Sequence, residues 1–153
     1  MSRSEIILLR ESAIDPTIME EARSILSQMG ILYREEVLPI LPSINHIRQL
    51  MDQLSQSVCI FAVGKSAYLL PVIAASITLQ QPLIVMPYPS DQASQSYLDT
   101  IFETIRGYPV AFTRAYDIQG AVLLAVHLLV GRHPSYADIL NAFIQRRQLQ
   151  PTN

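Results

Sequence analysis

The sequence predicts an α/β fold of the flavodoxin-like type: a five-stranded parallel sheet in the order 2-1-3-4-5, with helices on both faces and an extra C-terminal helix. Two observations favour this fold. Short apolar runs alternate with segments of helical periodicity along all 153 residues, and the connections between them are short. Strands that alternate with helices pair in parallel. We expect one domain over residues 1–153, with a core at about 5–132 and a last helix at about 135–148.

The expected strands are short apolar runs, most of them without a regular polar face. Such runs are typical of strands that are covered on both sides. They fall at residues 5–10, 31–37, 58–63, 82–86 and 109–115.

The helices are expected from their end signals and from apolar residues at helical spacing. Asp15 and Pro16 can begin the first helix, and Gly30 can end it. Ser43 can cap the second helix, and Asp117 the fifth. The remaining helices are expected at 66–79, 97–106 and about 135–148.

Composition narrows the classes of function. The net charge is −2, which argues against a nucleic-acid partner, because such proteins need a basic face. The single cysteine rules out an internal disulfide. A zinc site is not expected, because one cysteine and three histidines far apart in the sequence do not have the spacing of zinc ligands. No apolar run is long enough to cross a membrane, and the N-terminus lacks a signal-peptide core. We therefore expect a cytoplasmic protein with no metal and no cofactor.

Two of the expected helices, at 66–79 and 118–131, are apolar nearly all round. A helix on the surface of a monomer should have a polar face, so this pattern predicts a homo-oligomer. An alternative is that the C-terminal helix covers one of them. His127 lies in the second helix, where a neutral histidine in an interface is expected more often than a catalytic one.

Gly64-Lys65-Ser66 resembles the end of a phosphate-binding P-loop, but the spacing excludes that motif. The P-loop requires a glycine five residues before Gly64, and Cys59 stands there. A strand followed by a turn and a helix can still hold an anion on backbone amides. In the predicted sheet, this turn lies beside the loop after the first strand, at the switch point where ligands bind.

Five segments, in order and at near-constant spacing, resemble the PurE family of purine synthesis: aminoimidazole ribonucleotide carboxylase and carboxyaminoimidazole ribonucleotide mutase. Two of them lie where the family has S-x-S-D after its first strand and where its carboxylase branch has G-R-S after its third strand, although Ile14 replaces the second serine. The others resemble P-P-P-S-D of the carboxylase branch, R-G-I-P-V of the mutase branch and the apolar last core helix. The segments are Ser12–Asp15, Gly64–Ser66, Pro87–Asp91, Arg106–Val110 and Gly120–Ala125.

The resemblance implies a flavodoxin-like sheet, an octamer with central helices buried between subunits, and a ribonucleotide ligand. By the same resemblance, Ser12 would help to hold the phosphate and Asp15 would bind the ribose. The other candidate ligand-binding residues are Gly64, Lys65, Ser66 and Ser90.

The sequence departs from the family where the family's chemistry lies. Glu11 replaces the glycine before the first serine, which puts a negative charge beside the expected phosphate. The family's S-A-H-R loop is Pro39-Ile40-Leu41-Pro42 here, so Leu41 replaces the proton-transferring histidine and Pro42 replaces the phosphate-binding arginine. Leucine cannot transfer a proton, and proline carries neither a charge nor an N–H.

Weak candidates for a recruited catalytic role are His46, Lys65 and Asp91. Glu11 and Lys65 could instead form an ion pair that fills the pocket. The favoured hypothesis is a degenerate PurE-like homo-oligomer, a scaffold, binding or regulatory module with weak phosphate or ribonucleotide affinity. Its partners would be further copies of itself and either a phosphorylated small molecule or another protein. The alternative is an active carboxylase or mutase with a rearranged site.

Overall fold

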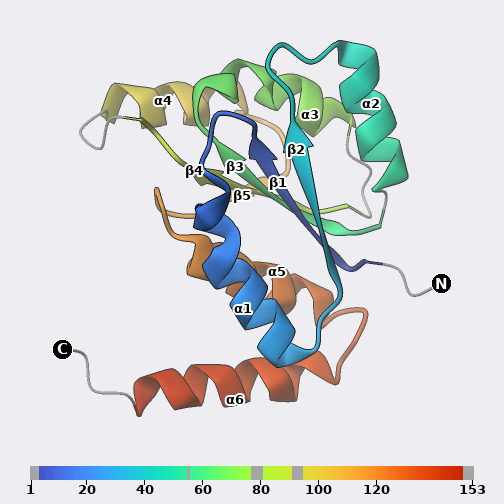
Figure 1. The fold of residues 1–153 in the computed structure, drawn as a ribbon, viewed down its shortest axis with the longest axis vertical. Coiled ribbons are helices and arrows are strands. Elements are labelled where there is room, and N and C mark those ends of the chain that lie inside the picture. The colour runs from blue at the N-terminus through green and yellow to red at the C-terminus, as the bar shows by residue number, and fades with distance from the viewer. Residues whose placement is uncertain (1–3, 55, 77–80, 91–94, 150–153) are drawn as a thin grey trace.

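The computed structural model describes residues 4–54, 56–76, 81–90 and 95–149. They form a parallel sheet in the order β2-β1-β3-β4-β5, sandwiched between two layers of helices (Figure 1). This arrangement confirms the predicted fold class and strand order. The strands are β1 (Ile6–Glu11), β2 (Tyr33–Leu38), β3 (Val58–Val63), β4 (Leu83–Pro87) and β5 (Val110–Phe112).

The helices begin and end close to the predicted signals. The side chains of Asp15, Ser43 and Asp117 cap the elements that follow them, and Gly30 ends α1 in the left-handed conformation with φ 69°. The helices are η1 (Pro16–Met19), α1 (Glu20–Met29), α2 (Ile44–Gln53), η2 (Lys65–Leu69), α3 (Leu70–Ser76), α4 (Gln95–Thr104), α5 (Ile118–Leu129) and α6 (Tyr136–Gln148).

Two predicted elements differ from the structure. The helix expected at 66–79 begins as the 3-10 turn η2 and becomes α-helical only at Leu70, which places Pro71 in the first α-helical turn, where proline is tolerated. Residues 77–79 lie outside the described residues. The last strand is shorter than expected, because the chain leaves the sheet after Phe112.

The core lies on both sides of the sheet. Strand β3 is buried along its whole length, and its residues alternate between the two faces. Helices α1 and α5 cover one face, with α6 packed against α5, and α2, α3 and α4 cover the other face (Figure 1). Both faces are therefore dry, which explains why the central strands read as continuous apolar runs.

The two all-apolar helices have different surroundings. Helix α5 packs on β3 and β4 and is covered by α1 and α6, so most of its apolar surface is buried within one subunit. Only His127 and Leu128 are exposed on it. Helix α3 buries Leu70 and Ile73 but leaves Ala75 exposed. The oligomer prediction therefore depends on α3 and its neighbours more than on α5.

Helix α6 is tied to the start of β1. The Tyr136 hydroxyl donates to the Glu5 carboxylate, and His133 Nε2 lies 2.9 Å from Glu5 Oε1. Burial and the hydrogen bond to Glu5 raise the pKa of Tyr136 to about 12. Over the residues described, no helix has the length and apolarity needed to cross a membrane.

Candidate functional site

A pocket opens where β1, β3 and β4 end. In the sheet register, Glu11 pairs with Leu38 of β2, and Val63 at the end of β3 pairs with Pro87 at the end of β4. The chain leaves β1 toward the face that carries α1 and leaves β3 toward the face that carries α3. This divergence is the switch point of the sheet, the usual place for a ligand in such folds.

The pocket has a volume of about 250 Å³. Ile14 in its wall is fixed by Arg10, whose guanidinium Nη1 donates to the Ile14 carbonyl over 3.1 Å. The lining combines apolar side chains with two carboxylates and one lysine: Glu11, Ala13, Ile14, Asp15, Gly64, Lys65, Tyr88 and Ser90.

Glu11 is the buried charged group of this pocket. Its side chain is only 5% exposed, and its carboxylate accepts a hydrogen bond from the Gly64 N–H. A Cβ at Gly64 would lie 3.1 Å from the Tyr88 carbonyl oxygen and 3.3 Å from Glu11 Oε2, so a side chain there would crowd both oxygens. Lys65 also lines this pocket and is exposed on its rim.

Tyr97 supports the same loop from α4. Its hydroxyl lies 2.6 Å from the Gly64 carbonyl oxygen and 2.9 Å from that of Val63. Burial, together with the negative charge of Glu11, raises the pKa of Tyr97 well above its ordinary range. Sequence reasoning did not assign Tyr97 to the site. The available signal was general: a tyrosine on the inner face of a helix needs a partner for its hydroxyl.

A pair of tyrosines shapes the wall on the β4 side. The rings of Tyr88 and Tyr116 meet edge to face with their centroids 4.9 Å apart. The Tyr116 hydroxyl donates to the Pro89 carbonyl, and Tyr116 itself has a left-handed backbone with φ 64°. These contacts fix the segment that leads to Ser90. Tyr116 was not predicted as part of the site either.

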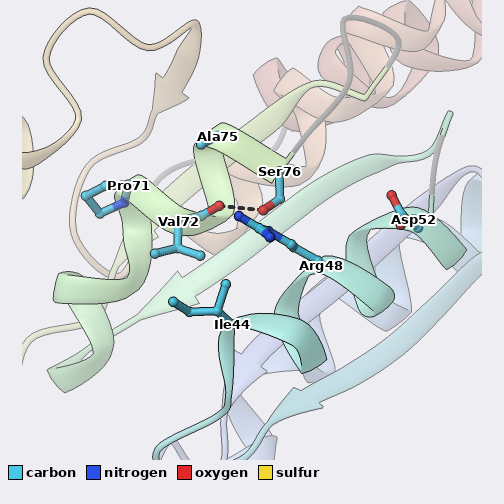
Figure 2. A pocket seen from close by; sticks show the side chains of 7 residues that line it. All are labelled: Ile44, Arg48, Asp52, Pro71, Val72, Ala75 and Ser76. Carbon is cyan, nitrogen blue, oxygen red and sulfur yellow. Dashed lines mark hydrogen bonds between the residues drawn. The ribbon is translucent and has the colours of Figure 1, made fainter.

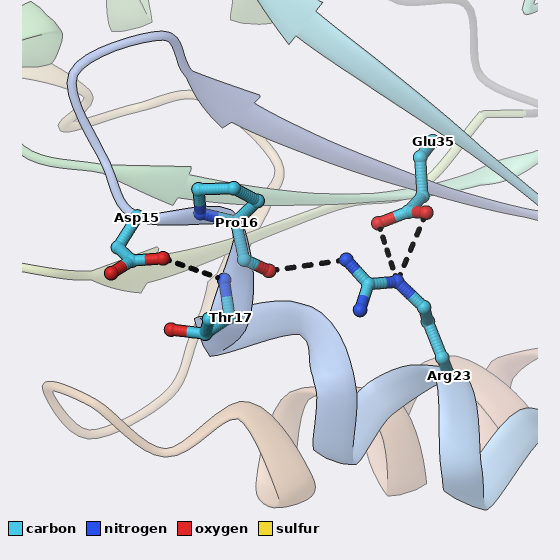
Figure 3. A network of polar contacts seen from close by, with 5 residues as sticks. All are labelled: Asp15, Pro16, Thr17, Arg23 and Glu35. Carbon is cyan, nitrogen blue, oxygen red and sulfur yellow. Dashed lines mark hydrogen bonds and ion pairs between the residues drawn. The ribbon is translucent and has the colours of Figure 1, made fainter.

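Asp15 is held by its role as a helix cap (Figure 3). Its Oδ1 accepts from the Thr17 N–H over 2.9 Å, and hydrogen bonds from Thr17 lower the pKa of Asp15. The next carbonyl, that of Pro16, accepts from Arg23 Nη2 over 3.1 Å, and Arg23 Nε lies 3.0 Å from Glu35 Oε1 on β2. The loop is therefore anchored to α1 and β2 and presents an ionised carboxylate at the rim.

The other predicted residues are not gathered in this pocket. Ser12 is exposed and outside the lining, and its N–H donates to the Leu38 carbonyl. His46 is exposed in the first turn of α2, also outside the lining. The backbone of Ser66 belongs to η2, but its side chain lies outside the described part of the chain, and so does all of Asp91.

The loop between β2 and α2 is exposed and apolar at its tip. Ile40 is 76% exposed and Leu41 81% exposed. Leu41 has φ 53°, a left-handed conformation that is uncommon for a residue with a Cβ. The four residues at positions 39–42 carry no side chain able to transfer a proton or to bind a phosphate.

A second cavity of about 430 Å³ lies between α2 and α3 (Figure 2). Arg48 extends from α2 toward α3, and Asp52 lies one turn further along the same helix. We call this cavity the α2–α3 groove. It is lined by Ile44, Arg48, Asp52, Pro71, Val72, Ala75 and Ser76.

Comparison with known proteins identifies relatives of this architecture. A family model described as AIR carboxylase matches residues 5–150. The structure is similar to that of PurE from Treponema denticola, with a TM-score of 0.77 and 19% identity over 94% of this chain and 90% of that chain. It is also similar to a serine-to-aspartate variant of Treponema denticola PurE2, with a TM-score of 0.80 and 19% identity over 96% and 92% of the two chains. A search of curated proteins finds no match.

Proposed function

The chain belongs to the AIR carboxylase family, and from that premise we propose that it is a PurE-like homo-oligomer that has lost carboxyl-transfer chemistry and acts as a binding, scaffold or regulatory module. The observation that carries the proposal is the apolar β2–α2 loop. Leu41 stands where the resemblance places the proton-transferring histidine, and its side chain is exposed to solvent.

Loss of the proton-transferring histidine should greatly lower the rate of carboxyl transfer. Carboxyl transfer to a ring carbon requires removal of a proton from that carbon after the new bond forms. A positioned acid or base contributes about 100- to 10,000-fold to such a step, which is roughly 3–5 kcal/mol of the barrier. Replacement of the arginine by Pro42 also removes a charged anchor for a phosphate. Remote binding of this kind orients the reacting centre, so its loss weakens catalysis as well as affinity.

Weak affinity for a phosphorylated ligand is part of the proposal. Lys65 and Ser90 line the pocket at the switch point, and Asp15 lies on the same rim. Lysine binds a phosphate as a point charge, without the two-pronged geometry of arginine. Calorimetry with ribose 5-phosphate should give at most millimolar affinity that weakens further in Lys65→Ala. No heat and no thermal shift at millimolar ligand would contradict this part.

Self-association is expected through the α2–α3 groove, and the resemblance suggests an octamer. The groove has an apolar floor with Arg48 and Asp52 on adjacent turns of α2. A two-fold axis through it would pair Arg48 of each copy with Asp52 of the other. Ala75→Arg, which adds a charge at an exposed position of α3, should lower the mass measured by light scattering. Gln28→Arg, at an exposed position of α1, is the matched control.

An active enzyme with a rearranged site is the second candidate. It is favoured by one observation: Asp15 and Lys65 line the same pocket, so two ionisable groups remain near a bound ligand. His46 would have to approach from outside the lining to act as an acid, and Asp91 belongs to a segment that is not described. Turnover that disappears in Lys65→Ala or His46→Ala would support this candidate.

A further inference from the structure

The pocket at the switch point contains the groups that hold an anion, together with an anion supplied by the protein. The Gly64 N–H points to the inside of the pocket, and the Lys65 ammonium group lies at its rim. Backbone amides and ammonium groups are the usual donors to carboxylate and phosphate oxygens. The group that receives the Gly64 N–H in this structure is the Glu11 carboxylate.

Glu11 is built into the site and is not a flexible surface side chain. It ends β1 with 5% exposure, and its carboxylate packs closely against the glycine that donates to it. Its charge also reaches the next layer of the site, because it contributes, after burial, to the raised pKa of Tyr97. The lining therefore carries two carboxylates, Glu11 and Asp15, and one ammonium group, Lys65, while the Arg10 guanidinium lies behind the wall and donates to the Ile14 carbonyl.

We propose that Glu11 is a specificity-determining residue: its carboxylate acts as the resident anion of the pocket, so that the site disfavours phosphate monoesters and favours a ligand that presents a hydrogen-bond donor. This inference deepens the proposed function and rests on it for the assumption that the pocket binds a small molecule. A phosphate in the pocket would compete with Glu11 for the Gly64 N–H and would be repelled by its charge.

The expected effect is large enough to measure. For two unit charges separated by roughly 6 Å at an effective dielectric constant of about 20, the repulsion corresponds to about 100-fold in affinity. Lys65 offsets part of this repulsion. Removal of the Glu11 charge should therefore tighten phosphate binding by about 10- to 100-fold.

The test compares wild type with Glu11→Gln and Glu11→Gly. Glutamine keeps an acceptor for the Gly64 N–H and removes the charge, while glycine also empties the space. Inorganic phosphate and ribose 5-phosphate are the probes, and neutral ribose is the control ligand, all measured by calorimetry. Phosphate and ribose 5-phosphate should bind about 10- to 100-fold more tightly to Glu11→Gln, and ribose affinity should not change. Adding Lys65→Ala to Glu11→Gln should remove most of the gain.

Two results would overturn the inference. One is that folded Glu11 variants bind phosphate no more tightly than wild type, and the other is that both variants lose their fold by circular dichroism. The last result would make Glu11 a structural residue. Failure of the proposed function would be seen in a different experiment, as carboxylase or mutase turnover by wild type. That result would not change the comparison of phosphate affinity between wild type and the Glu11 variants.

Discussion

Replacing Tyr97 with phenylalanine removes one hydroxyl from the support of the pocket and leaves the ring in place. The hydroxyl has one proton and two acceptors, the Gly64 carbonyl oxygen at 2.6 Å and the Val63 carbonyl oxygen at 2.9 Å. A net hydrogen bond is worth about 0.5–1.5 kcal/mol, and an acceptor left without a partner adds to the loss. Because Tyr97 is only half-buried, water can replace part of the interaction, so we expect a loss of about 1.5 kcal/mol.

Tyr68→Phe is the matched control, because Tyr68 is 58% exposed on η2. Urea unfolding followed by circular dichroism at one fixed protein concentration measures both variants, since self-association would make stability depend on concentration. In thermal unfolding of the same samples, Tm should fall by about 3–6 °C in Tyr97→Phe, given the length of the chain. The control should change the free energy of unfolding by less than about 0.5 kcal/mol. Equal losses in both variants, or no loss in Tyr97→Phe, would refute the reasoning.

Two further perturbations test the core and the β2–α2 loop. Burial raises the pKa of the Cys59 thiol from 9.0 to about 12. The stability linked to this thiol is therefore complete below pH 9 and is lost as the pH rises toward 12. When the pH is raised from about 8 to about 10.5, the free energy of unfolding should fall by about 2 kcal/mol less in Cys59→Ala than in wild type. Equal losses would mean that the thiol does not ionise on unfolding. Leu41→Gly should relieve the left-handed backbone at φ 53° and exceed the stability of Leu41→Val by about 1–2 kcal/mol, measured by urea unfolding, whereas equal stabilities would show that this conformation is not retained in solution.

The fold could be predicted from the sequence because local signals agreed with one another. The apolar runs of β1, β3 and β4 are buried on both faces, and the caps at Asp15, Ser43 and Asp117 form as expected. The sequence was less informative about the coverage of α5. Its apolar pattern is compatible both with an oligomer interface and with cover from α1 and α6, and only packing distinguishes the two.

The candidate site could be predicted in part. Asp15, Gly64, Lys65 and Ser90 were expected there from the switch point and the motifs, and all four line the pocket. The partner of Glu11 was not predictable, because its hydrogen bond goes to a backbone N–H that sequence patterns do not identify. The support from tyrosines on α4 and after β5 was missed for the same reason: their hydroxyls donate to backbone carbonyls far away in the sequence.

Turnover is the measurement that tests the central claim most directly. Purified protein is incubated with aminoimidazole ribonucleotide and bicarbonate, or with the carboxyamino ribonucleotide, and the carboxylated product is followed by ultraviolet absorbance. An active carboxylase of the family for the first substrate and an active mutase for the second, assayed in parallel, provide the reference rates. Because Leu41 supplies no proton-transfer group, we predict a rate at least about 100-fold below the reference with either substrate. A rate equal to the reference would contradict the account and would require another residue to move the proton.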